Sequence, residues 1–247
     1  MNEPQAGARA PGGATGREAA RWVRWMFSSV AGRYDLLNHL LSLNVDRWWR
    51  WKTVSRVREI LARPGVRVVD LCCGTGDLAL AMQRRCAAVA LGCDFSHEML
   101  RRAQEKAARQ RAHTAFFEAD ALQLPVVDAS LDLVTAAFGF RNLADYRRGL
   151  QEILRVLKPG GVAAILEFSQ PGNPLLAALY GFYSRRILPV LGGLISGSRE
   201  AYRYLPESVQ RFPGPEALAQ AMRQEGFRAV RYEPMTGGIV VLHLAVK

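Results

Sequence analysis

The stretch that decides the fold is "VVDLCCGTGD", residues 68–77. An apolar run ends there in two cysteines and a glycine-rich turn, which an aspartate closes. A short apolar run that stops at glycine is typical of a buried strand followed by a tight turn. Glycine also allows the backbone to come close to a ligand. The stretch therefore predicts a strand, a ligand-binding turn and a helix that begins at about Asp77.

The same alternation of strand and helix continues along the chain. Five strands are predicted before residue 170, at 66–72, 87–94, 114–120, 131–138 and 162–168. Helices are predicted between them at 77–85, at 96–110 with Ser96 as N-cap, and at 146–157, where "KPGG" ends the helix. A helix at 215–225 and two strands at 227–233 and 238–246 follow. Strands that alternate with helices imply an α/β fold with a parallel sheet and right-handed crossovers.

Three regions lie outside this alternation. Residues 1–20 are rich in Ala, Gly and Arg and contain no apolar segment, so we expect a flexible N-terminal arm. Residues 21–247 are expected to form a single domain. Within it, the aromatic and basic residues 21–60 are predicted to form a helical cap, and residues 172–212 an insertion that covers the substrate.

The composition limits the classes of function. Thirty-three Lys and Arg stand against 22 Asp and Glu, which gives a net charge of +11. This excess favours an anionic partner such as nucleic acid, anionic lipid or an anionic ligand. The longest apolar stretch, residues 187–196, is too short to span a bilayer, so we expect a cytoplasmic protein. The four cysteines have no CxxC spacing and the four histidines are scattered, so no metal site is predicted.

The acidic residues that follow the strands indicate a nucleoside ligand. Gly74, Thr75 and Gly76 form the turn after the first strand, and Asp94 ends the second, about twenty residues later. The carboxyl ends of parallel strands share one edge of the sheet, where ligands bind. Asp94 can accept hydrogen bonds from both ribose hydroxyls. After the third strand, Asp120 can accept from the adenine amino group, and the N–H of Ala121 can reach a ring nitrogen.

Two cofactors compete for this turn. A nicotinamide dinucleotide calls for G-x-G-x-x-G, and the third glycine is missing here. Asp77 would also place a negative charge where a pyrophosphate should bind. S-adenosylmethionine carries an ammonium group and a sulfonium but no phosphate, and Asp77 suits its ammonium group. The sequence therefore favours S-adenosylmethionine over the dinucleotide.

Four further stretches resemble the ubiquinone/menaquinone biosynthesis C-methyltransferase family. The first contains the family's Tyr-Asp-x-Met-Asn signature with Leu37 for Met, and has Asp46 where the family has His. Ala137 stands where some members have a serine. The four stretches, in order, are "YDLLNHLLSLNVDRWW" (34–49), "FGFRN" (138–142), "RVLKPGGVAAILEFS" (155–169) and "YRYLPES" (202–208).

The resemblance implies a fold and a cofactor. The fold is that of the class I S-adenosylmethionine-dependent methyltransferases, Rossmann-like, with a mostly parallel seven-stranded sheet and an antiparallel C-terminal strand. Thr75, Asp94, Asp120 and Ala121 match the family's cofactor-binding positions. Gly74 and Gly76 belong to the same turn.

The resemblance also implies a reaction, methyl transfer to a ring carbon of a reduced polyprenyl naphthoquinol. A benzoquinol acceptor is the main alternative, and an RNA or other small molecule is a more remote one. We assign Arg141, which stays protonated, to stabilise a developing aryloxide. Tyr34 and Asn142 are expected to orient the ring hydroxyl or a water that accepts its proton. His243 lies in an apolar strand and is expected to be a packed imidazole, and the reaction needs no thiol, so Cys72 and Cys73 are predicted to be packing residues.

A polyprenyl quinol lies in the bilayer, so the basic charge has a natural explanation. Basic residues attract anionic headgroups, and Trp favours the membrane interface. We expect peripheral contact with the inner face of the cell membrane and no nucleic-acid partner, since the position after the fourth strand holds "AAFGFRN" and not an Asn/Asp-Pro-Pro-aromatic motif. The sequence gives no indication of oligomeric state. The residues expected at the membrane are Arg21, Trp22, Arg24, Trp25, Arg47, Trp48 and Arg50.

Overall fold

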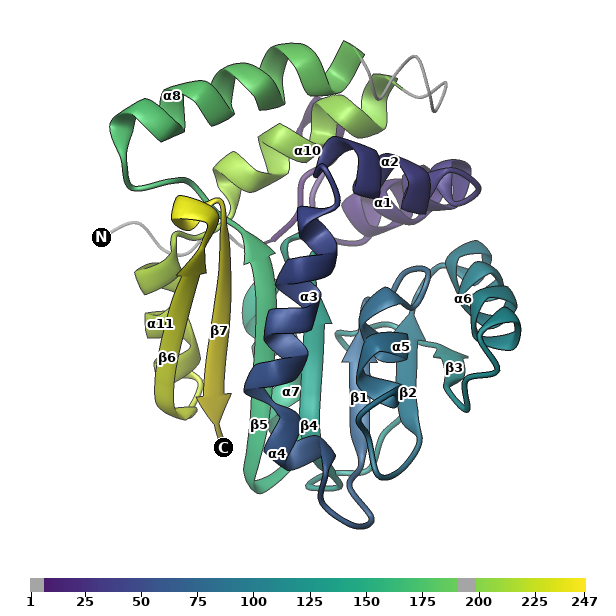
Figure 1. The fold of residues 1–247 in the computed structure, drawn as a ribbon. Helices are drawn as coiled ribbons and strands as arrows, with labels where there is room; N and C mark the ends of the chain where they lie inside the picture. Colours follow the sequence, from purple (N-terminus) through teal and green to yellow (C-terminus); the bar gives the residue numbers. More distant parts are fainter. Residues whose placement is uncertain (1–6, 191–198) are drawn as a thin grey trace.

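A seven-stranded sheet forms the centre of the molecule (Figure 1). The fold was obtained as a computed structural model, which describes residues 7–190 and 199–247. The strand order is β3-β2-β1-β4-β5-β7-β6, and β7 runs antiparallel to both of its neighbours. This order confirms the predicted mostly parallel sheet with an antiparallel C-terminal strand. The strands are β1 Val68–Leu71, β2 Ala90–Asp94, β3 Ala115–Glu118, β4 Leu131–Ala137, β5 Leu157–Phe168, β6 Arg228–Met235 and β7 Val240–Val246.

Helices cover both faces of the sheet and its upper end. In Figure 1, α3, α4 and α5 lie in front of the sheet, α7 and α11 lie behind it, and α1, α2, α8 and α10 lie beyond the carboxyl ends of the parallel strands. The α-helices are α1 Gly16–Val30, α2 Tyr34–Leu41, α3 Val45–Arg56, α4 Arg58–Leu61, α5 Asp77–Gln83, α6 His97–Arg109, α7 Tyr146–Val156, α8 Pro174–Phe182, α10 Arg199–Arg211 and α11 Pro215–Gln224. The short turns are η1 Pro11–Gly13, η2 Phe140–Asn142, the π-helical η3 Tyr183–Ile187, and η4 Thr236–Gly238.

Helix α7 follows its sequence pattern except at its end. Asp145 caps it by accepting the Arg148 N–H at 2.9 Å, and the side chains that recur at helical spacing are buried against the sheet. The prediction that Leu157 is helical is wrong, because Leu157 begins β5 and pairs with Leu131. Pro159 disfavours helical backbone at the residue before it, so the chain becomes extended there.

The N-terminal region differs from the expected flexible arm. The backbone N–H of Ala8 donates to the carbonyl of Leu143 at 2.8 Å, and Ala8 and Ala10 are buried. Helix α1 begins at Gly16 and not at residue 21. The chain at Ala8 and Ala10 is therefore packed against the domain, which short side chains allow although they leave no sequence pattern that predicts it. Residues 1–6 of the expected arm, like residues 191–198 of the expected insertion, lie outside the described residues.

Within the described ranges, no helix has both the length and the apolar content needed to cross a membrane.

Candidate functional site

The turn after β1 is shaped by left-handed backbone. Gly74 and Gly76 have φ values of +55° and +82°, and Gly76 is the N-cap of α5. A Cβ at Gly76 would lie 3.0 Å from the ring of Phe116 and 3.2 Å from the Cβ of Ala103. Only glycine satisfies both the dihedral angle and the space. The turn therefore holds its backbone N–H groups at the carboxyl end of β1, as the sequence predicts.

Asp94 holds this turn from the end of β2. Its Oδ2 accepts the Gly74 N–H at 2.8 Å and its Oδ1 accepts the Ser96 N–H at 2.9 Å. Burial raises its pKa to about 6, against the lowering effect of these backbone hydrogen bonds. Each carboxylate oxygen retains a lone pair beyond these bonds, which a ligand hydroxyl can use.

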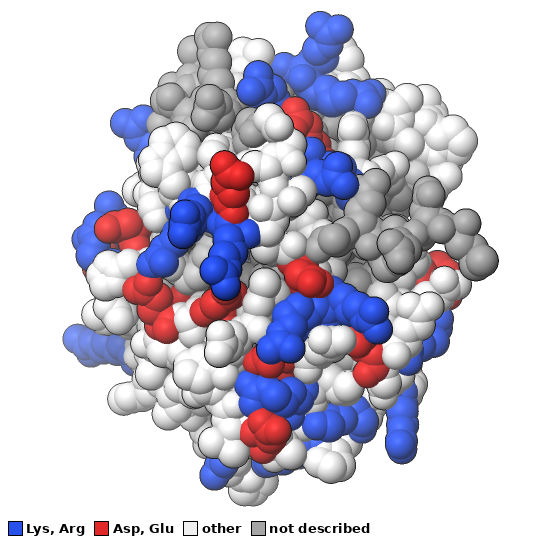
Figure 2. Space-filling model, turned by 180° about the vertical axis from the view of Figure 1, so that it is seen from behind, with Lys and Arg blue, Asp and Glu red and all other residues white. Residues whose placement is uncertain are grey.

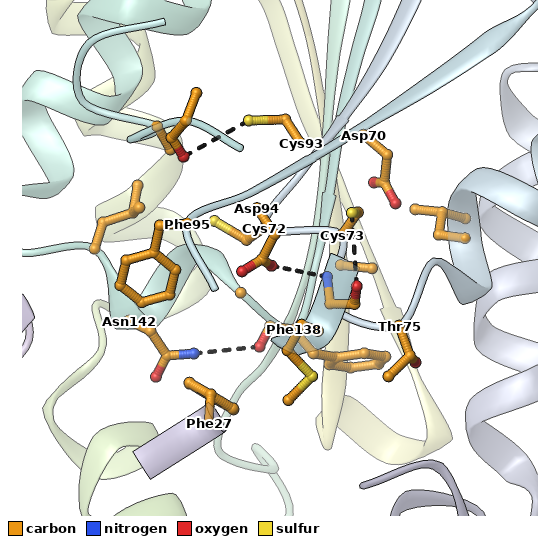
Figure 3. Close-up of a pocket in the computed structure, with 18 of the residues that line it drawn as sticks. Phe27, Asp70, Cys72, Cys73, Thr75, Cys93, Asp94, Phe95, Phe138 and Asn142 are labelled. Carbon is orange, nitrogen blue, oxygen red and sulfur yellow. Dashed lines mark hydrogen bonds between the residues drawn. The ribbon is translucent and has the colours of Figure 1, made fainter. Parts of the chain in front are cut away.

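The turn and Asp94 line a first cavity of about 970 Å³ (Figure 3). Asp120 and Ala121 line it from the loop after β3, and Asp120 is exposed, with its Oδ1 accepting the Leu122 N–H at 2.9 Å. Five of the six predicted cofactor residues line this cavity, whereas Gly76 shapes the turn behind it. A buried carboxylate with spare lone pairs beside the exposed Asp120 fits a nucleoside that presents ribose hydroxyls and a base amino group.

Asp77 lines the first cavity and lies beside two cations of the protein. Its Oδ1 pairs with Lys106 Nζ at 2.7 Å, and its Oδ2 lies 3.7 Å from Arg50 Nη2. Although burial acts to raise the pKa of Asp77, these two cations lower it overall. The expectation that Asp77 faces the ammonium group of a ligand stays a prediction. Residue spacing alone does not reveal Lys106, which comes from α6.

Lys106 also connects α2 to the glycine turn. Its Nζ lies 2.6 Å from Asp35 Oδ2 and 3.2 Å from Thr75 Oγ1, and the Thr75 hydroxyl donates to Asp35 Oδ1 at 2.5 Å. Asp35 adjoins Tyr34 at the start of α2. The hydrogen-bond network of Asp35, Thr75, Asp77 and Lys106 therefore fixes the helix that carries Tyr34 to the turn.

A second cavity of about 1460 Å³ adjoins the first. Its wall is largely apolar and comes from α1, α2 and α3, from η3 and α10, and from aromatic residues at the ends of β4 and β5. The insertion contributes Tyr180, Tyr183, Leu188, Tyr204 and Leu205. Four residues line both cavities: Phe27, Tyr34, Arg50 and Phe138.

Tyr34 lies at the junction of the two cavities. Its ring is 3.9 Å from the position of a Cβ on Gly74 and packs edge-on against Phe27 at a centroid distance of 6.0 Å. Burial raises its pKa, against the lowering effect of its hydrogen bond with Asn38 and of Arg141. Tyr34 is therefore a neutral phenol at physiological pH.

Arg141 lies in the wall of the second cavity, with its guanidinium 5.3 Å from the centroid of the Phe168 ring. Its Nη1 donates to Glu167 Oε1 at 2.7 Å and to the Phe138 carbonyl at 2.5 Å, and its Nε donates to Ser208 Oγ at 3.2 Å. Burial acts to lower the pKa of Arg141, but the adjacent Glu167 carboxylate raises it overall. Glu167, in β5, was not identified from the sequence, where an acid inside "VAAILEF" was the only indication.

Asn142 is bonded to the protein and faces the first cavity. Its Oδ1 accepts the Tyr204 hydroxyl at 3.1 Å, and its Nδ2 lies 3.5 Å from the Phe138 carbonyl (Figure 3). Of the three predicted catalytic residues, Tyr34 thus borders both cavities, Arg141 the second and Asn142 the first.

Asp46 is the centre of a buried charge network. Its Oδ2 accepts a hydrogen bond from Arg50 Nη1 at 2.5 Å and lies 2.9 Å from His39 Nδ1. Its Oδ1 accepts a hydrogen bond from the Ser42 hydroxyl at 2.7 Å. His39, Asp46 and Asp77 each offer a ligand atom within 4.8 Å of the others, and they are the only such group in the described residues. Arg50 pairs with Asp46 and Lys106 pairs with Asp77, so each acid of this group already has a cationic partner.

The basic and aromatic residues expected at a membrane have different environments. Arg50 is buried, and Arg24 forms an ion pair with Glu118, whereas Trp25 and Trp48 are exposed. His243 is buried, with Nε2 2.9 Å from the Pro215 carbonyl, which confirms its packed position, but its Nδ1 has no hydrogen-bond partner among the described residues. Figure 2 shows Lys and Arg mixed with Asp and Glu on the face behind the sheet, so the positive charge is not gathered there.

Comparisons with known proteins agree with this geometry. A demethylmenaquinone methyltransferase of Deinococcus radiodurans is 50% identical over 88% of this chain and 89% of its own, and one of Thermus thermophilus is 49% identical over 89% and 98%. A ubiquinone/menaquinone biosynthesis C-methyltransferase of Syntrophotalea carbinolica is 46% identical over 90% and 92%.

Solved structures agree on the fold alone. The [4+2]-cyclase SpnF matches with a TM-score of 0.69 at 17% identity, over 100% of this chain and 99% of its own. A phosphoethanolamine N-methyltransferase of Haemonchus contortus in complex with S-adenosylmethionine matches with a TM-score of 0.59 at 17% identity, over 79% and 52%. The pattern of the ubiE/COQ5 methyltransferase family matches residues 15–247, and the chain belongs to that family.

Proposed function

We propose that this enzyme transfers a methyl group from S-adenosylmethionine to a ring carbon of demethylmenaquinol, a reduced polyprenyl naphthoquinol, to form menaquinol. One observation carries the proposal: a cavity suited to a nucleoside adjoins a larger apolar cavity at Tyr34, Arg50 and Phe138. The names of the two relatives near 50% identity favour the naphthoquinol. A benzoquinol of the ubiquinone pathway is the second candidate, because a relative at 46% carries both names.

The first cavity is the proposed cofactor site. Asp94 would accept hydrogen bonds from the ribose hydroxyls and Asp120 from the adenine amino group, with the Ala121 N–H facing a ring nitrogen. When bound, S-adenosylmethionine supplies an electrophilic methyl group on a sulfonium sulfur. The chain's own tasks are to align the acceptor carbon with that methyl group, to exclude water and to increase the electron density on the ring.

Arg141 is the proposed stabiliser of negative charge on the acceptor. Loss of the proton from the ring hydroxyl beside the reacting carbon leaves an aryloxide, which pushes electron density onto that carbon. The bonds of Arg141 to Glu167, Phe138 and Ser208 use its backbone N, Nε and Nη1. Among the described residues Nη2 has no hydrogen-bond partner, so it is available to the aryloxide. A fixed cation in an apolar cavity acts more strongly than one in water.

Tyr34 and Asn142 are the proposed orienting groups. The raised pKa of Tyr34 keeps its hydroxyl protonated, so it can donate or accept a hydrogen bond but is not a strong base. We assign it to hold the ring hydroxyl, or a water that receives the hydroxyl proton, at the junction of the cavities. Asn142 positions Tyr204 through their hydrogen bond at 3.1 Å.

The acceptor's polyprenyl chain belongs in the bilayer. We therefore propose that a cytoplasmic enzyme meets its substrate by peripheral contact with the inner face of the cell membrane, where anionic headgroups match its charge of +11.

Purified enzyme incubated with methyl-labelled S-adenosylmethionine and reduced demethylmenaquinone tests the proposal. We expect labelled menaquinone, and slower transfer to the corresponding demethylated benzoquinol. Tight cofactor binding with no label in either quinone would exclude quinol methylation. Faster transfer to the benzoquinol would establish the second candidate instead.

A further inference from the structure

Two helices at the carboxyl end of the sheet carry apolar stripes that face away from the protein. Leu36 and Leu40 lie in α2, and Leu43 lies two residues beyond its end. The three recur at i, i+4 and i+7, with exposed fractions from 48% to 81%. In α8, Leu175, Leu179 and Phe182 have the same spacing and exposed fractions from 60% to 72%. An amphipathic helix normally buries such a stripe. None of the residues of α8 is buried, although its sequence is strongly apolar.

The α2 stripe borders the mouth of the apolar cavity. Leu43 lines that cavity and is also 81% exposed, so the cavity reaches the surface at the end of α2. The Tyr183 hydroxyl, in η3 directly after α8, donates to the Leu41 carbonyl of α2 at 2.7 Å. The inner sides of the two helical segments therefore meet at the cavity, and Figure 1 shows α2 and α8 at the same end of the molecule.

The segment that contains α8 and η3 carries charge of one sign. Residues 174–190 contain Arg185 and Arg186 and no acidic residue. Both arginines are exposed, and neither has an acidic partner in the described part of the chain. On α2 the one acid, Asp35, is paired with Lys106. An apolar surface beside exposed cations matches the boundary between the acyl chains and the anionic headgroups of a bilayer.

We propose that the outward stripes of α2 and α8, with Arg185 and Arg186, form a membrane-docking surface that brings the mouth of the apolar cavity to a bilayer containing anionic lipid. This surface rests on the proposed function, because the polyprenyl quinol proposed to occupy the apolar cavity would enter it from the bilayer. It adds a second contact to the basic and aromatic segments 21–25 and 47–50, in which Arg21, Trp25, Arg47 and Trp48 are exposed.

Vesicle flotation tests this surface. We expect the full-length protein to float with vesicles of phosphatidylcholine and phosphatidylglycerol at low salt, and less with phosphatidylcholine alone or at high salt. The double variant Leu175→Asp/Leu179→Asp should lower the partition coefficient at least about tenfold, because both apolar contacts are lost and two negative charges are added. Neither leucine lines a cavity.

A matched control lies elsewhere on the surface. Val127 is 77% exposed, in the loop before β4. Val127→Asp makes the same kind of change and should leave flotation unchanged. Melting curves of both variants establish that they are folded. An unchanged partition of the folded double variant would overturn the proposal, as would a wild-type protein that does not float. A dimer in solution that the double variant abolishes, without vesicle binding, would assign the surface to a second copy and also overturn it.

Activity separates this proposal from the proposed function. With a short-chain, water-soluble quinol the double variant should match the wild type, whereas with a long-chain quinol in vesicles its kcat/KM should fall at least about fivefold. Turnover of the short-chain quinol without flotation would sink the docking surface alone. Flotation without transfer to any quinol would leave the surface standing and sink the function.

Discussion

The two cavities are built in different ways. The first lies on the sheet: its acceptors stand at the ends of β2 and β3, and its turn is fixed between β1 and α5. The second takes most of its wall from helices outside the sheet. Its lining residues lie far apart in sequence, from Met26 to Ile239. The first cavity, the cofactor half of the site, is therefore set by backbone register. The second cavity, the acceptor half, depends on a few side-chain contacts between helices and sheet.

Those contacts are concentrated at two places. The network of Asp35, Thr75, Asp77 and Lys106 fixes α2 to the glycine turn, and the bonds of Arg141 join η2 to Glu167 in β5 and to Ser208 in α10. We therefore expect substitutions in the first cavity to alter cofactor affinity and substitutions in the second cavity to alter turnover.

The largest effect is expected at Arg141. Arg141→Ala removes the cation proposed to stabilise the aryloxide, so kcat should fall by about 10² to 10³. The dissociation constant for S-adenosylmethionine should stay within about twofold, because Arg141 does not line the first cavity. Isothermal titration and single-turnover transfer measure the two quantities.

A double variant controls for the unpaired charge that the single variant leaves on Glu167. Arg141→Ala leaves Glu167 buried and unpaired, which itself destabilises the protein. Arg141→Met combined with Glu167→Gln removes both charges, so it should be better folded than the single variant and equally inactive. Recovery of turnover in the double variant would show that Arg141 acts only by balancing Glu167.

The next effect is expected at Asp94. Asp94→Ala removes a charged acceptor and the partner of the Gly74 N–H, so the dissociation constant for the cofactor should rise about 10- to 100-fold. At saturating cofactor, kcat should change much less. Asp94→Asn keeps one acceptor oxygen, so its dissociation constant for the cofactor should lie between those of the wild type and Asp94→Ala. Equal affinity in all three proteins would remove Asp94 from the cofactor site.

A smaller effect is expected at Asp35, which connects the two halves. Asp35→Asn breaks the ion pair with Lys106 and weakens the contact with Thr75, so α2 and Tyr34 should be held less firmly. We expect the KM for the quinol and the cofactor dissociation constant to rise together, about three- to tenfold. Glu105→Gln is the control, because Glu105 lies on α6 next to Lys106 and its ion pairs in the described residues are all with arginines of that helix. A change in one constant alone would show that the halves are independent.

The cofactor half was largely predictable from the sequence. Strand ends are marked by apolar runs and glycines, and the carboxyl ends of parallel strands converge, so Asp94 and Asp120 were brought to one cavity by topology alone. Asp77 also lines this cavity, but its ion pair with Lys106 was not predicted. Its partner Lys106 comes from another helix, and spacing along the chain does not show which cation will neutralise an acid.

The acceptor half was predictable only as a list of candidates. Tyr34 and Arg141 line the second cavity and Asn142 lines the first, and their catalytic roles stay predictions. The contacts that Glu167, Ser208 and Tyr204 make with Arg141 and Asn142 were not predicted. A carboxylate inside an apolar strand signals a buried partner without identifying it. The packing of Ala8 against Leu143 was missed for a similar reason, since small side chains leave no periodic pattern.

A modest effect on stability is expected at Asp70, below the turn in β1. Burial raises its pKa to about 7, despite the hydrogen bond that it accepts from Thr135 at 2.6 Å. The folded protein then holds this proton more tightly than the unfolded chain, so this group's contribution to stability falls as the pH rises from about 4 to 7.

Asp70→Asn keeps an oxygen for Thr135 and cannot ionise. Its melting temperature should exceed that of the wild type by about 3–8 °C at pH 8, and the difference should shrink at pH 5. A difference independent of pH would mean that Asp70 does not titrate in this range.

The smallest effect is expected at Cys73, beside the glycine turn. Its N–H donates to the Cys93 carbonyl at 2.9 Å, a backbone bond that substitution keeps. Burial raises the pKa of its thiol well above the usual value, so it is not a thiolate, and transfer from a sulfonium to carbon needs no nucleophile from the protein. Cys73→Ala should therefore retain kcat within about twofold and lose about 1 kcal/mol of stability, measured by denaturant unfolding. A loss of turnover comparable to that of Arg141→Ala would mean that the thiol takes part in the chemistry, and the acceptor half would then extend into the strand that carries the cofactor turn.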